Sequence, residues 1–458
     1  MNVFSGSSRV VIVGSGPAGV RCAQVLVAAG VTPTLIEENR RDGGQIYRRQ
    51  PESFTRPYES LYGTEAGRAE HLHRSFEALR DRIEYLPETL VWNITEKQVH
   101  AVKGSKSVSV PFDAIILCTG ATDRLMPVRG WHLGGSYSLG GAQIALKAQA
   151  CSIGKQVVFA GTGPLLYLVA AQYVKAGATV AAVLDTSRWN SRMAAAGELL
   201  SAPSVLWKGI ALMLALRRAG VPIYTGADVL EINGSAEDGV DGVTFAHRGR
   251  QHHIQCDAIA MGYHLRPETQ LADLARCELR FDSLTRQWLP WTDPDGRSSV
   301  PGVYIAGDGA RVLGAVAAEL SGRLAAWAVL RDLGITPPAD RHAEARRAHK
   351  KLDRFAKGLA EAFPWPAHQA ARLSDDTILC RCESVRVGEL REILRETGAS
   401  EVNRAKAFSR VGMGRCQGRY CGHAAAEVIA HASGIPLEQV GRLRSQAPVK
   451  PIPIGIQP

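Results

Sequence analysis

Residues 9–19 read Arg-Val-Val-Ile-Val-Gly-Ser-Gly-Pro-Ala-Gly, and this stretch decides the fold. Its apolar, β-branched start predicts a buried strand, and the glycines after it predict a tight turn into a helix that stops at Gly30. Gly14 permits the sharp turn, Gly16 lets the backbone approach a pyrophosphate, and Gly19 lets the helix pack closely on the strand. The pattern is typical of a dinucleotide-binding unit.

An acidic residue stands where such a unit needs one. A second strand is expected at 34–36, and it runs directly into Glu37 and Glu38. Glu37 lies 18 residues after Gly19, at the separation where its carboxylate can accept a hydrogen bond from a ribose hydroxyl. Free N–H groups at the start of the helix face the phosphates. The predicted contacts of this first unit are Gly14, Ser15, Gly16, Pro17, Ala18, Gly19, Glu37 and Glu38.

The same pattern returns later in the chain. A strand before Gly161-Thr-Gly163, a helix and a second strand ending in Asp185 repeat the first unit at an offset of 161 − 14 = 147 residues. Leu166 replaces the third glycine, so we expect this helix to pack differently on its strand. Three interpretations stay open for Gly161, Gly163 and Asp185: an NAD(H) site, a site for another adenine nucleotide such as ATP or for a flavin edge, and a relic fold that binds nothing.

Two further segments belong with the first unit. A buried-type strand ends in Thr119-Gly120, and another ends in Gly307-Asp308. In a doubly wound sheet the carboxyl ends of the strands line the ligand crevice. Asp308 is therefore expected to accept a hydrogen bond from a ribityl hydroxyl, while the helix after it points its N-terminus at a phosphate. The alternative role for Asp308 is a plain helix N-cap.

The size and order of these pieces predict an α/β protein with two Rossmann-like dinucleotide-binding domains, one inserted in the other. The 458 residues, 45% of them hydrophobic, are enough for about three domains. A small α-rich domain is expected after a linker with a charged helix at about 340–357, and a Pro-rich tail is expected to be extended or to lie across a partner. The expected parts are 1–125 with 285–335, 126–284, the linker 336–374, the C-terminal domain 375–445 and the tail 446–458.

Charge and hydropathy limit the location and the partners. No apolar run reaches the 18 residues that a spanning helix requires, and no signal peptide is evident, so we expect a soluble, cytoplasmic protein. Lys and Arg exceed Asp and Glu by 54 − 44 = 10. This excess is spread over the chain without a long basic run, so a nucleic-acid partner is not expected.

Four of the nine cysteines crowd the C-terminal fifth. Cys380-x-Cys382 is followed, after 33 residues, by Cys416-x4-Cys421. Four thiolates suit either zinc or an iron–sulfur cluster, but the spacing within these pairs is unlike the two-residue spacing usual for zinc. Clustered thiols in a reducing compartment favour metal over disulfide. The predicted metal ligands are Cys380, Cys382, Cys416 and Cys421, and the neighbouring arginines that could offset their charge are Arg381, Arg415 and Arg419.

These motifs together resemble known families. The first unit, Thr119-Gly120 and Gly307-Asp308 resemble the FAD-dependent pyridine nucleotide-disulfide reductase superfamily, and the resemblance implies that Gly44 and Gln45 approach the isoalloxazine. No cysteine pair has the spacing that disulfide reduction at the flavin needs, so that chemistry is not expected. The C-terminal cysteine pattern resembles the bacterioferritin-associated ferredoxin domain, which implies a [2Fe-2S] cluster.

The combination resembles the alpha subunits of heteromeric FAD-dependent amino-acid and opine dehydrogenases, a group with D-hydroxyproline dehydrogenase, octopine and nopaline oxidases, L-proline dehydrogenase and hydrogen cyanide synthase. The resemblance implies a beta subunit of the amino-acid-oxidase type with its own FAD, a small third subunit in some assemblies, and an FMN at the subunit interface. It also implies a respiratory electron acceptor, which could hold the complex at the inner membrane. No catalytic residue for substrate oxidation is predicted in this chain.

Two functions of different classes follow. The first is a relay that passes electrons from the beta subunit through flavin and cluster, because flavins handle two electrons and [2Fe-2S] clusters one. The second is a self-sufficient NAD(P)H-dependent flavin and iron–sulfur reductase that uses the unit at 156–185. A scaffold in which the groups only hold shape is the third possibility.

Overall fold

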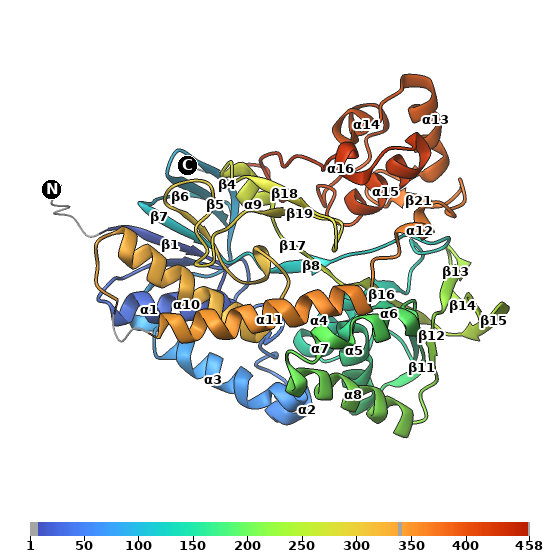
Figure 1. The fold of residues 1–458 in the computed structure, drawn as a ribbon, viewed down its shortest axis with the longest axis horizontal. Helices are drawn as coiled ribbons and strands as arrows, with labels where there is room; N and C mark the ends of the chain where they lie inside the picture. The colour runs from blue at the N-terminus through green and yellow to red at the C-terminus, as the bar shows by residue number, and fades with distance from the viewer. Residues whose placement is uncertain (1–7, 338–340, 457–458) are drawn as a thin grey trace.

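Two parallel five-stranded sheets form the framework of the computed structural model, which describes residues 8–337 and 341–456 (Figure 1). The strand order of the first sheet is β20-β7-β1-β2-β3, and every neighbouring pair is parallel. This order is doubly wound, with β1 at the centre. The strands are β1 (Val10–Val13), β2 (Thr34–Ile36), β3 (Glu84–Leu86), β7 (Ala114–Leu117) and β20 (Val303–Ile305).

Alternation of side chains along β1 fixes what covers each face of this sheet. Val10 and Ile12 join an apolar cluster with the helices on one face, while Val11 and Val13 join another cluster beneath a three-stranded antiparallel sheet. Because both faces are covered, the strand is apolar throughout. The covering elements are α1 (Pro17–Ala28), α3 (Ala66–Glu77) and α10 (Ala315–Asp332) on one face, and β4 (Thr89–Thr95), β5 (Gln98–Lys103), β6 (Lys106–Pro111) and α9 (Gln270–Leu274) on the other.

The second sheet repeats the arrangement with the order β12-β11-β10-β16-β9, again all parallel. Leu166, which replaces the third glycine, is fully buried among its apolar neighbours. The strands are β9 (Ser136–Ser138), β10 (Gln156–Thr162), β11 (Thr179–Asp185), β12 (Ile223–Thr225) and β16 (Ala258–Tyr263). The accompanying elements are α4 (Leu139–Ala148), α5 (Pro164–Lys175), α8 (Pro203–Arg218), β13 (Asp228–Ser235), β14 (Gly239–His247) and β15 (Arg250–Gln255).

A two-stranded antiparallel ribbon joins the two units. The chain leaves the first unit through β8 (Ala121–Asp123) and returns through β17 (Leu265–Pro267), which pairs with β8. This crossing confirms the expected α/β class with one dinucleotide-binding unit inserted in the other. The residue limits of the expected domains stay predictions.

A long helix runs along both units. α11 (His342–Ala362) contacts α10 of the first unit and the short helices α6 (Trp189–Ala194) and α7 (Ala196–Leu199) of the second (Figure 1). The helix expected at 340–357 therefore exists but continues to Ala362. Of the expected linker, Pro338 and Asp340 lie outside the described residues.

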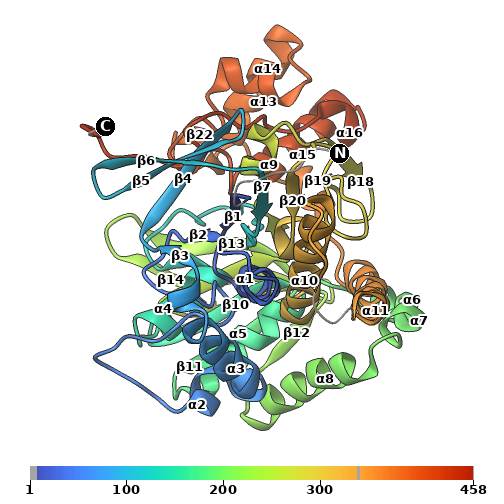
Figure 2. The same ribbon diagram turned by 90° about the vertical axis from the view of Figure 1, so that its left-hand side faces the viewer.

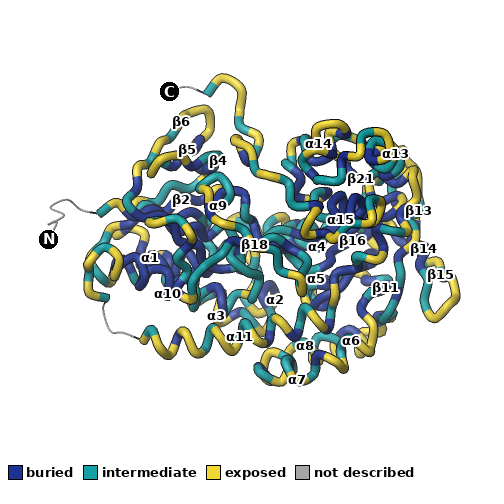
Figure 3. The backbone as a smooth tube through the Cα atoms, turned by 45° about the horizontal axis from the view of Figure 1, so that its top comes forward, coloured by how far each residue is buried: buried dark blue, intermediate teal, exposed yellow. Residues whose placement is uncertain are grey.

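The C-terminal part packs mainly on the second unit. Its apolar core is continuous with residues of β10, β14 and β16, and the Trp131 indole N–H donates to the Ile378 carbonyl. In Figure 3 the buried parts of the C-terminal domain lie inside exposed segments of the same domain. The elements are α12 (Ala367–Ala370), β21 (Ile378–Cys380), β22 (Val385–Arg386), α13 (Val387–Thr397), α14 (Val402–Ser409), α15 (Gly422–Ser433) and α16 (Leu437–Val440).

The Pro-rich tail returns to the first unit of its own chain. The Val449 N–H donates to the Trp92 carbonyl of β4, and the Val449 side chain is buried in the cluster beneath β4–β6. The described part of the tail lies beside β5 and β6 in Figure 2. At Val449 the tail therefore packs on its own chain, and the expectation that the tail is extended or lies across a partner stays a prediction. The remaining elements are α2 (Tyr58–Tyr62), β18 (Leu279–Asp282), β19 (Gln287–Pro290), and the 3-10 turns η1 (Gly63–Glu65), η2 (Arg80–Arg82) and η3 (Gly307–Gly309).

Candidate functional site

The first glycine turn has the geometry that a pyrophosphate cradle requires. A Cβ on Gly14, where φ is +103°, would lie 2.4 Å from the Cys118 carbonyl oxygen. A Cβ on Gly19 would lie 1.9 Å from the Gly14 carbonyl oxygen, so the close approach of α1 depends on that residue as well. A Cβ on Gly16 would meet only Gly44, at 3.7 Å. The α1 N-terminus, with Pro17 and Ala18 buried in its first turn, therefore faces the crevice with bare backbone.

The two acids after β2 occupy different environments. Glu37 is buried, and its carboxylate accepts hydrogen bonds from the Ser15 N–H at 2.7 Å and the Ser15 hydroxyl at 2.8 Å. This holds the carboxylate against the glycine turn, where a ribose would lie. Glu38 is exposed and forms an ion pair with Lys450 of the tail.

The loop expected near the isoalloxazine packs directly on the glycine turn. A Cβ on Gly44 would lie 2.9 Å from the Gly16 Cα, and the exposed Gln45 accepts a hydrogen bond from Arg48 at 2.7 Å. From the second unit, Lys147 donates to the Ile46 carbonyl at 2.8 Å. The Gly44–Gln45 loop is therefore held from both units.

The two other predicted turns meet beside α1. A Cβ on Gly307 would lie 2.9 Å from the Ala18 Cβ, and one on Gly309 would lie 2.7 Å from the Thr119 hydroxyl. Asp308 is not a helix N-cap, because its carboxylate accepts from the N–H groups of Leu313 and Gly314, before α10 begins. Burial raises the pKa of Asp308.

The predicted flavin contacts thus converge on one crevice at the carboxyl edge of the first sheet. Its glycines leave free the space that a Cβ would fill. The free N–H groups of the α1 N-terminus face the crevice, and the Glu37 carboxylate lies at the end where a ribose would bind. These residues fit an FAD, although their individual contacts with the cofactor stay predictions.

The second glycine turn lies in a different environment. A Cβ on Gly161 would lie 1.8 Å from the Gly262 carbonyl oxygen, so the strand-end geometry is kept. Asp185, however, is fully buried and forms an ion pair with Arg192. Burial raises the pKa of Asp185, and Arg192 opposes that rise.

The linker after α11 closes this second crevice. The His264 ring lies 3.2 Å from the position of a Cβ on Gly163, and its Nε2–H donates to the Phe363 carbonyl. The Arg192 guanidinium lies 5.0 Å from the centre of the Phe363 ring. Phe363 therefore sits between the residues that follow β16 and β11, where a second nucleotide would bind.

Trp365 anchors the same linker to the C-terminal domain. Its indole N–H donates to the buried Glu427 of α15 at 3.0 Å, and the Arg124 guanidinium lies 3.8 Å from its ring centre. Its ring also meets Tyr263 edge-on at 5.9 Å. The linker is thus held at Phe363 by the second unit and at Trp365 by the C-terminal domain.

The four predicted ligand thiols lie together between β21 and α15. Hydrogen bonds from Cys421 lower the pKa of Cys416 to about 5 and of Cys380 to about 6, and the same bonds raise the pKa of Cys421. A hydrogen bond from Cys382 also lowers the pKa of Cys416, and burial raises the pKa of Cys382. A Cβ on Gly414 would lie 2.2 Å from the Cys382 Cβ, so the loop needs a glycine there.

This thiol set has the donor chemistry of a metal centre. A [2Fe-2S] cluster is held by four cysteine thiolates, the number that these two loops supply. The donor chemistry and the glycine-bearing loop therefore fit a [2Fe-2S] cluster, with the individual ligand assignments still predictions.

The arginines near the thiols differ in environment. Arg419 is buried and donates to Glu268 at 2.8 Å, so much of its charge is balanced by that carboxylate. Arg381 lies 5.1 Å from the centre of the Trp131 ring, and Arg415 is exposed. Of the three, Arg419 is the one integrated into the protein interior.

Sequence reasoning missed the residues that join the thiol loop to the flavin cradle. Burial alone would raise the pKa of Glu268, but Arg419 and Arg266 outweigh it and lower the pKa. The Gln270 side-chain amide donates to the Gln417 carbonyl at 2.9 Å. These partners are about 150 residues apart, and only an alignment of homologues or a structure could have paired them.

The fold and the two sites define a flavoprotein that carries FAD and a [2Fe-2S] cluster, an FAD-dependent oxidoreductase. Residues 8–329 match pyridine nucleotide-disulphide oxidoreductase, and residues 378–431 match the BFD-like [2Fe-2S] binding domain. The chain belongs to the pyridine nucleotide-disulphide oxidoreductase family.

Known proteins match over nearly the whole chain. An opine oxidase subunit from Rhizobium meliloti is 37% identical, over 97% of this chain and 86% of the relative. Hydrogen cyanide synthase subunit HcnB of Pseudomonas aeruginosa is 31% identical, over 98% and 97%. The structure of L-proline dehydrogenase from P. horikoshii has a TM-score of 0.71 at 20% identity, covers 98% of this chain and 79% of that chain, and shows the likeness of fold. In the described part of this chain, no helix has both the length and the apolar character to cross a membrane.

Proposed function

We propose that this chain is the electron-transfer (alpha) subunit of a heteromeric amine or amino-acid dehydrogenase whose substrate is D-hydroxyproline or an opine. An FAD-containing beta subunit of the amino-acid-oxidase type oxidises the amine, and a respiratory acceptor receives the electrons. The relatives that are named as subunits of opine oxidase and hydrogen cyanide synthase support such an assembly. An FMN at the interface and a small third subunit belong to the same proposal.

The observation that carries the relay is a continuous anchor between flavin cradle and thiol loop. The Glu268 N–H donates to the Gly120 carbonyl at 2.9 Å, and the Thr119 hydroxyl donates to the Glu268 carbonyl at 2.7 Å. The Glu268 carboxylate accepts from Arg419, which stands between Cys416 and Cys421. Glu268 thus fixes the two sites relative to each other.

This anchor suits transfer between two groups in one chain. Bound FAD supplies two-electron chemistry and a bound [2Fe-2S] cluster supplies one-electron chemistry. Arg419 and Glu268 are both buried, so their ion pair keeps the thiol loop in one position and keeps water out of the contact. The chain contributes position and exclusion of water, which a relay needs.

The linker argues against the NAD(P)H-dependent reductase. Phe363 and His264 fill the crevice beside Gly163, and Asp185 is already paired with Arg192. A nicotinamide nucleotide or ATP would have to displace the linker and break a buried ion pair, which is costly. We therefore favour the relay.

The test uses the complex as the cell assembles it. A tag on this chain is used to purify the assembly, co-purifying chains are identified, and D-hydroxyproline, octopine or NADH is added separately while the paramagnetic signal of the reduced cluster is recorded. We expect an amino-acid-oxidase-like partner and a signal with one of the amine substrates. A chain that purifies alone and is reduced rapidly by NADH would overturn the proposal.

Glu268→Gln tests the anchor. The substitution removes one partner of a buried ion pair, so we expect cluster reduction in the complex to slow by about tenfold or more while FAD and iron contents stay near stoichiometric. The pair costs about 3 kcal/mol to break from one side, so retention of both cofactors is measured first. Glu278→Gln, which removes an exposed acid paired with Arg280, is the matched control. Equal rates of cluster reduction in both variants would contradict the claim that Glu268 positions the two sites for electron transfer.

A further inference from the structure

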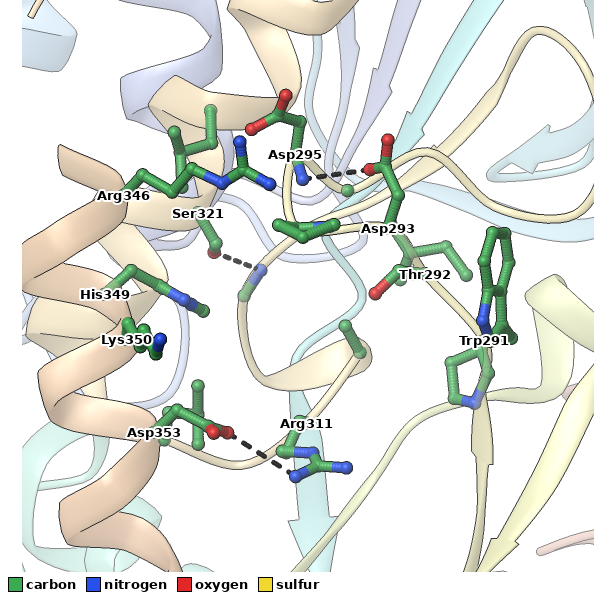
Figure 4. A pocket seen from close by; sticks show the side chains of 18 of the residues that line it. Trp291, Thr292, Asp293, Asp295, Arg311, Ser321, Arg346, His349, Lys350 and Asp353 are labelled. Carbon is green, nitrogen blue, oxygen red and sulfur yellow. Dashed lines mark hydrogen bonds and ion pairs between the residues drawn. The ribbon is translucent and has the colours of Figure 1, made fainter. Parts of the chain in front are cut away.

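A second cleft is lined in part by the Gly307–Leu313 loop. Its volume is about 990 Å³, and its walls come from one face of α11, the segment after β19 and the loop before α10 (Figure 4). The Gly307 N–H donates to the Ser321 hydroxyl at 2.7 Å, and the Asp308 carboxylate is held by Leu313 and Gly314. The loop that carries the predicted flavin contacts Gly307 and Asp308 thus also contributes Gly307 to the lining of this cleft.

The four carboxylates of the cleft share two guanidinium groups, Arg311 in its lining and Arg297 outside it. Asp353 and Asp282 both pair with Arg311, at 3.4 and 3.3 Å. Asp295 accepts from His342 at 2.8 Å. Asp293 pairs with Arg297 at 3.2 Å, and the same guanidinium lies 3.6 Å from Asp295. The lining as a whole holds five Lys and Arg side chains against four Asp side chains, a formal balance of +1 that favours an anion.

Three cations of α11 in the lining, Arg346, Arg347 and Lys350, have no such partner among the described residues. Arg346 and Lys350 lie one helical turn apart, and in the described ranges neither forms an ion pair or a hydrogen bond. In Figure 4 Arg346 and His349 extend from α11 into the cleft, opposite Trp291. Burial lowers the pKa of His349, so its neutral ring can donate one hydrogen bond. The α11 wall is therefore cationic and rich in donors.

The opposite wall is partly apolar. Trp291, Phe281 and Leu289 line it, and the Arg280 guanidinium covers the Trp291 ring at 5.2 Å. A cleft of this size with apolar surface on one side and convergent polar groups on the other is typical of a small-molecule site. A free inorganic anion would fill only a small part of it.

We propose that this cleft binds a mononucleotide, with the phosphate on Arg346 and Lys350 and the base against the Trp291 wall. Arg offers a fork that matches phosphate oxygens, and Lys adds a point charge. The proposal assigns a ligand to a site that is distinct from both dinucleotide crevices. It does not depend on the relay, because the cleft holds none of the predicted flavin or cluster ligands except Gly307.

The test measures binding of adenosine monophosphate to the full chain loaded with FAD and cluster, by calorimetry. We expect one site per chain, with affinity that falls as salt rises and that is weakened about tenfold or more in Arg346→Ala/Lys350→Ala. The control Lys351→Ala/Arg395→Ala removes the same charge from exposed positions outside the cleft and should bind as the wild type does. Both variants should keep the FAD and iron contents of the wild type.

Inorganic phosphate and adenosine, titrated separately, distinguish the sources of affinity. We expect each to bind at least about tenfold more weakly than the mononucleotide, because each uses one wall of the cleft. Phosphate that binds as tightly as the mononucleotide would reduce the site to an anion site and overturn the proposal. Absence of mononucleotide binding, or binding unaffected by loss of Arg346 and Lys350, would also overturn it.

Discussion

Lys147 is a lysine whose ammonium group has almost no access to water. It lies on α4, donates to the Ile46 carbonyl beside the flavin loop, and has no carboxylate partner in the described chain. Burial, helped by the charge of Arg48, lowers the pKa of Lys147 to about 7. In the unfolded chain the pKa is about 10.4. Between these two values the unfolded chain binds a proton that the folded chain does not.

Stability should therefore rise with pH over this window. The slope of the free energy of unfolding against pH follows the excess of protons bound by the unfolded state, which is positive from about pH 7 to 10 for Lys147. Lys147→Met removes the titrating group, so we expect a gain of about 1–2 kcal/mol at pH 7 and a weaker dependence on pH. The measurement is the thermal unfolding midpoint at pH 7, 8 and 9. Lys351→Met, at an exposed site on α11, is the control, and an identical pH profile in both variants would contradict the assignment.

At the scale of elements, short sequence motifs predicted the strands, turns and helices of the two dinucleotide-binding units. They did not predict contacts between residues far apart in the chain. The glycine turns at 14–19 and 161–163 follow from backbone geometry that a few neighbouring residues encode, and the structure forms both. Whether the second turn binds a ligand depends on Phe363, some 200 residues further along. No periodicity or spacing near Gly161 carries that information. The same limit hid Glu268, whose partner Arg419 is 151 residues away.

The cysteine pattern was predictable because thiolate spacing is local within each pair. What the sequence did not indicate is that the tail returns, so that Arg419 also donates to the Val449 carbonyl at 2.7 Å. The apolar valine decides this path, although the surrounding prolines suggested an extended segment. Proline content limits local conformation, while burial of apolar area decides where the segment lies.

Cluster removal tests how far the thiol loop stabilises its own domain. Cys421→Ser removes a buried predicted ligand at the N-cap of α15, so we expect loss of iron and faster amide exchange at 378–386 and 411–433. FAD content should stay unchanged, because the flavin cradle lies in the first dinucleotide-binding unit and not in the C-terminal domain. Hydrogen-exchange mass spectrometry together with iron and flavin counts measures both. Cys151→Ser, at an exposed cysteine of the second unit, should change neither, and retention of iron in Cys421→Ser would refute the ligand assignment.

At the scale of the whole molecule, ion pairs connect the C-terminal domain to both dinucleotide-binding units. Arg442 pairs with Asp273 at 2.6 Å, Arg286 with the buried Glu427 at 2.6 Å, and Arg372 with Asp228 at 3.0 Å. The Glu268–Arg419 pair is a fourth link between the same parts of the chain, and it is buried. A relay with a fixed distance needs such a clamp, because rotation of one domain would separate the two sites.

The Asp273–Arg442 pair makes this clamp dependent on pH. Burial would raise the pKa of Asp273, but hydrogen bonds from Arg442 and the Ser445 N–H outweigh burial and lower it. A carboxyl with a lowered pKa contributes its full stability above the unfolded value of about 3.9 and loses it as pH falls through the folded value. The wild-type clamp should therefore hold down to below about pH 4.

Arg442→Met removes the partner and leaves a half-buried carboxylate. We expect a loss of about 1–3 kcal/mol at pH 7, faster amide exchange at 441–450, and release of this segment at a higher pH than in the wild type, because Asp273 no longer has a lowered pKa. Arg444→Met, two residues along and exposed, should keep wild-type exchange at every pH. If both variants behave alike between pH 4 and 7, the pair does not clamp the domain, and the contact between flavin cradle and thiol loop must depend on Glu268 and the apolar core alone.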